Sequence, residues 1–289
     1  MRKFLCFLCL CALLLGGCGR QAATADIAAT TLPVYEFTAR LCQGTPLTVA
    51  RLVTEQVSCL HDYSLNVRQV KAAEAARAIV ISGAGLEEFM EDLLAEEKTI
   101  DASAGIALLC GEGEDHEDHE GHHHDRDPHI WLDPENAKQM AQNICEGLSR
   151  RFPDYEDAFE GNLVGLLADL DRLQVYGESA LDSLGCRELI TFHDGFSYLA
   201  RAYDLDILKA VEEESGSEAS AKELIALISL VEQHRLPAIF TERSGSTSAA
   251  AIIARETGAR CFSLDMAMAG DSYFQAMYHN FDTLKEALQ

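Results

Sequence analysis

Apolar runs of strand length alternate with segments of helical spacing along the first part of the chain. The runs occupy residues 27–31, 47–53 and 78–82, and the helical patterns follow them at 34–41, 67–76 and 86–94. This alternation is typical of βαβ units and predicts a parallel sheet. Further strand-length runs, mostly separated by helical stretches, occupy residues 188–192, 207–211, 238–241 and 260–264. The pattern therefore predicts an α/β protein with two lobes, each a parallel sheet flanked by helices.

A single long helix is expected between the lobes. Residues 155–184 contain no proline, and their apolar residues recur at helical spacing: Phe159, Leu163, Leu166, Leu167, Leu170 and Leu173. A helix of about 30 residues would be about 45 Å long and would join the lobes rigidly, although each interior glycine costs about 1 kcal/mol relative to alanine. We expect an N-terminal lobe over 26–154, a connecting helix over 155–185 and a C-terminal lobe over 186–289.

The first residues have the pattern of an export signal. Arg2 and Lys3 precede a short apolar run, and Leu15-Gly16-Gly17-Cys18 resembles the processing site of bacterial lipoproteins. We expect a signal peptide over 1–17, lipidation at Cys18 and a tether over 18–25. The protein would then lie on the outer side of the cytoplasmic membrane, at the cell surface or in the periplasm. A plain signal peptide or an uncleaved anchor is the alternative.

Charge narrows the choice of partner. The formal net charge is −24, which argues against nucleic acid or an anionic membrane face and favours a cationic ligand. Residues 111–127 hold eight carboxylates against one arginine and lack apolar residues, so we expect a disordered surface loop. Its histidines are candidate weak metal ligands: His116, His119, His122, His123 and His124. The loop is either a metal-collecting antenna or a solvated acidic insertion.

Cysteine usage does not indicate a cysteine metal cluster. Six of the ten cysteines lie beyond Cys18, far apart and without a Cys-x-x-Cys pair: Cys42, Cys59, Cys110, Cys145, Cys186 and Cys261. They could form disulfides outside the cytoplasm, but the sequence predicts no connectivity.

Three histidines outside the acidic loop and one aspartate are the candidate metal ligands. His61, His129 and His193 sit just after strand-like runs or turn signals, and Asp265 ends the last apolar run. Carboxyl ends of parallel strands face the binding crevice of an α/β sheet, so these side chains could converge in the cleft between the lobes. Neutral imidazoles with one carboxylate suit Zn²⁺. Taken singly, a histidine after a strand is more often a hydrogen-bonded structural residue than a ligand, and His234 and His279 are expected to be surface or capping residues.

From about Asp26 onward, the chain resembles the ZnuA-like substrate-binding proteins of zinc and manganese ABC importers. The resemblance rests on residues 60–64, 82–88, 127–134, 191–198, 256–259 and 264–265. It implies a two-lobe binding protein, not an enzyme, that delivers zinc to a membrane permease, with His61, His129, His193 and Asp265 as ligands. We expect it to act as a monomer.

The resemblance also bears on the identity of the metal. Zinc-type members carry a histidine-rich acidic loop before the second ligand, whereas manganese-type members have glutamate in place of His193. Imidazole favours zinc and added carboxylate favours manganese, so zinc is the expected cargo, with manganese as the alternative. One departure is Ser58-Cys59-Leu60, which lacks the usual proline before His61 and leaves Cys59 as a group that could ligate or oxidise.

Two other classes of function compete with transport. A zinc hydrolase would use the three histidines as ligands with Glu242 or Asp265 as general base, but no His-Glu-x-x-His pattern occurs and a fourth protein ligand would close the site to water. A surface adhesin or zinc buffer would depend mainly on the histidine loop and leave the four ordered ligands without a role.

Overall fold

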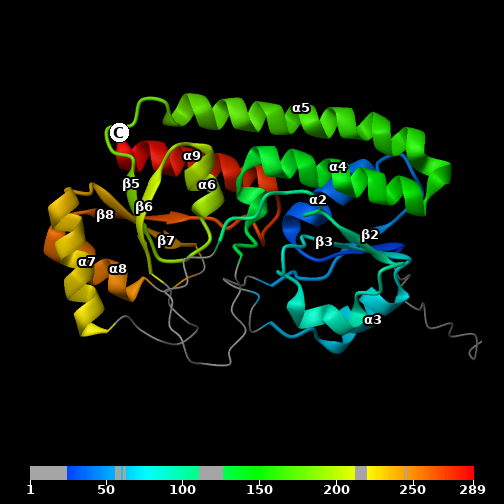
Figure 1. The fold of residues 1–289 in the computed structure, drawn as a ribbon, viewed down its shortest axis with the longest axis horizontal. Coiled ribbons are helices and arrows are strands. Elements are labelled where there is room, and N and C mark those ends of the chain that lie inside the picture. The colour runs from blue at the N-terminus through cyan, green and yellow to red at the C-terminus, as the bar shows by residue number, and fades with distance from the viewer. Residues whose placement is uncertain are drawn as a thin grey trace, which may run out of the picture.

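Two parallel sheets of four strands each form the two lobes of the protein (Figure 1). The computed structural model describes residues 25–55, 60, 63–110, 126–211, 220–243, 245 and 247–289. The strand orders, β2-β1-β3-β4 and β6-β5-β7-β8, follow the same scheme in both lobes. The first sheet contains β1 (Ile27–Ala29), β2 (Val49–Arg51), β3 (Ala78–Ile81) and β4 (Thr99–Asp101). The second contains β5 (Glu188–Thr191), β6 (Asp206–Ala210), β7 (Ala238–Glu242) and β8 (Arg260–Leu264).

The strands predicted from apolar runs are present in both lobes. Strands β1, β3 and β7 are buried along their whole length, which explains why they read as continuous apolar runs. The edge strand β4 was not among the predicted elements, because it has three residues and only Ile100 is buried. All strand pairings in the described residues are parallel, so the carboxyl ends of the strands in each sheet lie at one edge.

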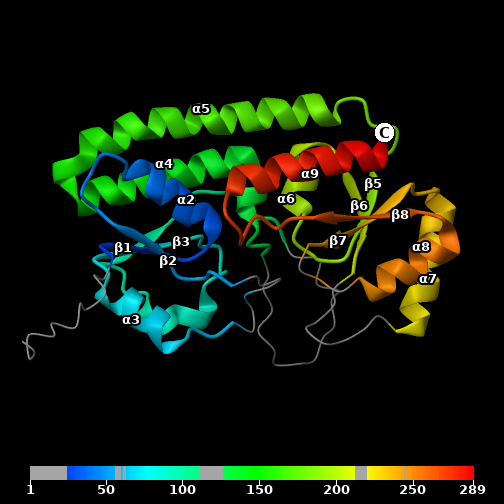
Figure 2. The ribbon, with the colours of Figure 1, turned by 180° about the vertical axis from the view of Figure 1, so that it is seen from behind.

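A layer of long helices covers both lobes (Figures 1 and 2). The connecting helix α5 (Glu156–Leu181) packs against α4 (Pro134–Arg151), α9 (Tyr273–Leu288) and α2 (Leu32–Leu41). The helix α5 ends before the predicted boundary at 185, because the backbone N–H groups of Gly185 and Cys186 donate to Leu288 O at the end of α9. Close packing explains the glycine at position 177 inside this helix, because a Cβ there would lie 2.6 Å from Cζ of Tyr203.

Shorter helices complete each lobe. In the N-terminal lobe, α3 (Val67–Ala75) begins with an Asn66 capping box. Residues predicted as a helical pattern at 86–94 instead form the 3₁₀ helix η1 (Glu88–Leu93), since Met90 has non-helical φ and ψ angles. The remaining helices are η2 (Ile130–Leu132), η3 (Pro153–Tyr155), α6 (Ser197–Ala202), α7 (Ala221–His234) and α8 (Ser248–Thr257).

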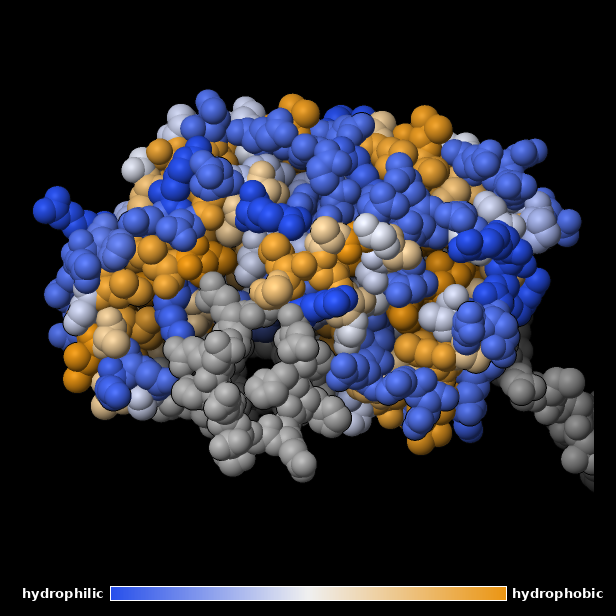
Figure 3. Space-filling model, viewed as in Figure 1, coloured by the Kyte–Doolittle hydropathy of each residue, from blue (hydrophilic) through white to orange (hydrophobic). Residues whose placement is uncertain are grey.

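The two lobes share one hydrophobic core and direct hydrogen bonds. Arg51 Nη1 donates to Gly270 O at 2.7 Å, and Glu36 Oε2 accepts from Tyr273 N–H at 2.6 Å. These contacts and α5 join the two lobes, so the predicted fold class is confirmed: two α/β lobes joined by one long helix. Hydrophilic residues cover much of the helical layer on the face seen in Figure 3. No helix within the described residues is long and apolar enough to cross a membrane.

Candidate metal centre

His129 lies immediately before η2, with its ring held by a buried carboxylate. Asp127 Oδ1 accepts a hydrogen bond from the backbone N–H of His129 at 2.9 Å and lies 2.8 Å from His129 Nδ1. An ionised carboxylate only accepts hydrogen bonds, so Nδ1 carries the proton of the neutral ring. The other ring nitrogen, Nε2, is therefore the one available to a metal.

Asp127 is itself fixed from the other lobe. The hydroxyl of Tyr198, on α6, donates to Asp127 O at 3.0 Å and accepts from Leu109 N–H at 2.9 Å. Burial raises the pKa of Tyr198, which keeps this hydroxyl protonated. The segment that carries His129 is thus anchored at the junction of the lobes.

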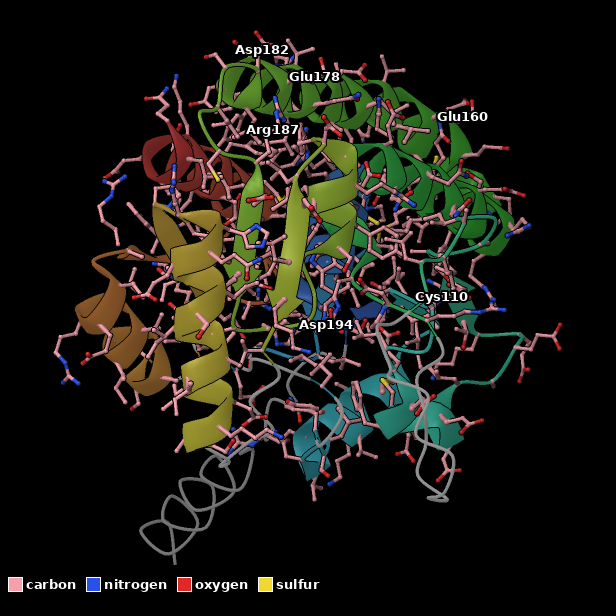
Figure 4. All side chains as sticks on the ribbon, turned by 60° about the vertical axis from the view of Figure 1, so that its left-hand side comes forward. Cys110, Glu160, Glu178, Asp182, Arg187 and Asp194 are labelled. Atoms are coloured by element: carbon pink, nitrogen blue, oxygen red, sulfur yellow. The ribbon has the colours of Figure 1, made fainter. Side chains whose placement is uncertain are left out.

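His193 follows the end of β5 and meets His129 across the junction. The two ring centroids are 5.3 Å apart with the rings nearly perpendicular, at 82°. His193 Nδ1 lies 3.8 Å from Oε2 of Glu242, a buried residue at the end of β7. Asp194, the next residue after His193, lies near the junction of the lobes in Figure 4.

Gly195 leaves room beside the ring of His193. A Cβ at this position would lie 2.9 Å from His193 Nε2 and 2.6 Å from Cε of Met266. Any larger residue would crowd the nitrogen that faces away from Glu242. The glycine in the segment His193-Asp194-Gly195 therefore leaves space beside that nitrogen, which is buried in the structure.

Asp265 directly follows β8 and is held on several sides. Its Oδ1 accepts from Ala267 N–H at 2.8 Å, and its Oδ2 lies 3.2 Å from Arg243 Nη1. The buried amide of Asn280, on α9, accepts from Asp265 N–H and donates to Asp265 O, both at 2.7 Å. The backbone of Asp265 is therefore fixed, while its carboxylate is shared between two donors.

Further contacts bring the three segments together. Trp131 Nε1, two residues beyond His129, donates to Met266 O at 2.7 Å, one residue beyond Asp265. Met266 also borders the space beside His193. The structure thus places His129, His193 and Asp265 around the junction of the lobes. No three His, Cys, Asp or Glu side chains in the described part of the chain already form a group able to hold a metal ion.

Several predicted site residues lie outside the described residues. They are Cys18, Cys59, His61 and the loop histidines His116, His119, His122, His123 and His124. The residues beside His61 are anchored: Leu60 is buried and its carbonyl accepts from Tyr63 N–H at 3.1 Å. The hydroxyl of Tyr63 donates to Glu55 at 2.8 Å and accepts from Gln69 Nε2 at 2.6 Å.

The other histidines and cysteines lie apart from this site. His234 pairs with Glu188 at 3.1 Å, and His279 is exposed on α9, as expected of surface residues. The five cysteines within the described ranges carry free thiols, so no disulfide joins them to one another: Cys42, Cys110, Cys145, Cys186 and Cys261.

Sequence reasoning missed two residues that hold the candidate ligands. Asp127 had a local signal, because it stands two residues before His129. Asn280 had none, because its contact with Asp265 spans 15 residues and depends on how α9 packs. Glu242 was considered only as a general base for a hydrolase, whereas the structure places it beside His193. Two imidazoles with carboxylates next to their Nδ1 atoms are suited to binding a divalent metal.

Similarity to known proteins extends over almost the whole described chain. The profile of the ZnuA family, "Zinc-uptake complex component A periplasmic", matches residues 27–287. The zinc-binding lipoprotein AdcA of Streptococcus pneumoniae is 29% identical over 297 residues, covering 96% of this chain and 59% of AdcA. The chain therefore spans less than two thirds of that relative. A putative metal-binding protein of Treponema pallidum is 27% identical over 240 residues, covering 78% of this chain and 76% of its own length.

Solved structures agree with this relationship. A crystal structure of ZnuA matches with a TM-score of 0.76 at 30% identity, covering 91% of this chain and 99% of ZnuA. The Zn(II)-bound ZnuA-like domain of Streptococcus pneumoniae AdcA matches with a TM-score of 0.78 at 25% identity, covering 92% and 99%. The chain therefore belongs to the ZnuA family of zinc-uptake components, a family of metal-binding proteins rather than enzymes.

Proposed function

We propose that the protein captures Zn²⁺ outside the cytoplasmic membrane and delivers it to the permease of an ABC importer. The single observation that carries the proposal is the pair of rings from His129 and His193, 5.3 Å apart. They come from different lobes, and each has a carboxylate near its Nδ1 atom. Relatives named as zinc-binding, and a Zn(II)-bound structural neighbour, support zinc as the cargo.

The proposed ligand set is His61, His129, His193 and Asp265. Three neutral imidazoles and one carboxylate would give Zn²⁺ four ligands, and a fully occupied coordination shell suits storage and transfer better than catalysis. His193 supports zinc over manganese, because an imidazole at this position is a poorer ligand for Mn²⁺ than a carboxylate. The fixed Nδ1 contact of His129 would orient Nε2 before the metal arrives.

The remaining parts of the chain fit an exported carrier. We propose that residues 1–17 are removed, that Cys18 carries the lipid, and that residues 18–25 tether a monomer to the outer side of the membrane. The lobes would be residues 26–154 and 186–289, joined by 155–185. The histidines of the 111–127 loop would bind further zinc weakly, because a flexible tract pays an ordering cost on binding.

Metal analysis tests the proposal. Protein purified without a chelator or an affinity-tag metal should contain one tightly held zinc per chain. Cells that lack the protein should lose high-affinity zinc uptake, and the chain should restore it only when the permease is present. Tight manganese in place of zinc, or uptake that does not depend on the chain, would contradict the proposal.

A further inference from the structure

Arg243 forms an ion pair with one of the proposed ligands. It follows the last residue of β7, and its backbone N–H donates to Leu264 O at 2.9 Å. This extends the parallel pairing of β7 with β8 by one residue and sets Arg243 beside Asp265. Its Nη1 lies 3.2 Å from Asp265 Oδ2.

The pair occupies the side of the carboxylate that a metal would need. Oδ1 of Asp265 accepts the backbone N–H of Ala267 at 2.8 Å, whereas the partner of Oδ2 is an exposed side chain that can move away. Arg243 binds that oxygen. A metal that takes Oδ2 must therefore displace the guanidinium or share the oxygen with it, and a positive charge stays close to a divalent cation.

A purely structural role for this ion pair has little support. The Arg243 side chain is 63% exposed, and exposed ion pairs contribute little to folding stability. Asp265 does not depend on Arg243 for its position, because Asn280 clamps its backbone with two hydrogen bonds. Arg243 can thus leave the carboxylate without disturbing the segment that carries it.

We propose that Arg243 limits the metal affinity of the centre and speeds metal release by competing for Asp265. The inference rests on the proposed function, since it takes Asp265 as a ligand. As the metal departs, the guanidinium returns to the carboxylate and neutralises its charge. A carrier gains from this arrangement, because cargo that binds too tightly is released too slowly to the permease.

Arg243→Gln tests the inference, with Arg255→Gln as the matched control. Arg255 lies on α8 in the same lobe and pairs with its neighbour Glu256, so its loss changes the net charge equally without touching a proposed ligand. Zinc affinity is measured by competition with a chromophoric chelator at one equivalent of metal. The dissociation rate is measured by transfer of zinc to excess chelator, and the Tm of the metal-free proteins checks folding.

Arg243→Gln should bind zinc about tenfold more tightly and release it correspondingly more slowly, while Arg255→Gln matches the wild type. The advantage should shrink at high salt, because the competing charge is exposed. If the wild type binds zinc tightly but the zinc affinity of Arg243→Gln is within about twofold of the wild type, or weaker, this inference alone is overturned. Absence of tight zinc binding in the wild type would overturn the proposed function and this inference together.

Discussion

Replacing Asp127 with asparagine should weaken zinc binding without unfolding the protein. The Asp127 carboxylate is buried and contacts both the backbone N–H and Nδ1 of His129, at 2.9 and 2.8 Å. Asparagine keeps an oxygen that can accept both hydrogen bonds but removes the negative charge. The His129 ring then becomes a poorer electron donor to the metal at Nε2.

The expected loss can be bounded. Removing a partner of a metal-bound histidine typically costs about 10- to 100-fold in affinity, or about 1.4 to 2.7 kcal/mol. Asparagine preserves the geometry, so we expect the lower end, about tenfold. Stability should change little: Asp127 Oδ2 has no hydrogen-bond partner within the described residues, and the amide nitrogen would take its place.

The assay is chelator competition on the wild type, Asp127→Asn and Asp133→Asn. Asp133 lies in the same segment and is also buried, but it caps α4 through Glu135 N–H and pairs with Arg201. Asparagine caps helices as well as aspartate does, so this control should retain wild-type affinity. If Asp127→Asn binds zinc as tightly as the wild type, or if both variants lose the same affinity, the Asp127 charge does not act through His129.

Three further predictions address specificity, the loop and a buried acid. His193→Glu should lower the ratio of zinc to manganese affinity at least about tenfold, measured by titrating both metals; an unchanged ratio would remove His193 from the ligand set. Deleting residues 112–126 should leave one tight zinc site by calorimetry; its loss in a folded variant would make the loop a primary ligand. Burial raises the pKa of Glu87 from 4.5 to about 7. The protonated Glu87 side chain therefore contributes fully to stability below pH 4.5, and this contribution is lost as pH rises through 7. The difference in unfolding free energy between the wild type and Glu87→Gln should consequently fall by up to about 3 kcal/mol between pH 4 and 8. If denaturant titrations show that this difference in unfolding free energy does not change with pH, the prediction for Glu87 is wrong.

Local patterns predicted the strands better than the helical layer. Buried parallel strands such as β3 and β7 leave continuous apolar runs in the sequence, so their positions were predicted to within one residue at either end. The helix α4 was not among the expected elements, although Asp133-Pro134 is a start signal. The helix η1 departs from the predicted helical pattern at Met90, which only the backbone geometry reveals.

The residues of the candidate centre also differ in whether a local sequence pattern predicts them. His129 and His193 stand in short segments with local signals, so sequence alone could nominate them. Asp127 is also local to His129, but other groups that contact the candidate ligands come from elsewhere in the chain: Glu242 reaches His193 from another strand, and Arg243 reaches Asp265 through the β7–β8 register. Such contacts follow from strand order and packing, which residue spacing does not encode.

The position of the bound metal can be measured by anomalous diffraction at the zinc edge, from crystals of the zinc-loaded protein. We expect one strong peak at the junction of the lobes, within about 2.0 to 2.2 Å of Nε2 of His129, Nε2 of His193 and a carboxylate oxygen of Asp265, with His61 as the fourth ligand. A strong peak bound only by residues of the 111–127 loop, or one that includes neither His129 nor His193, would contradict it.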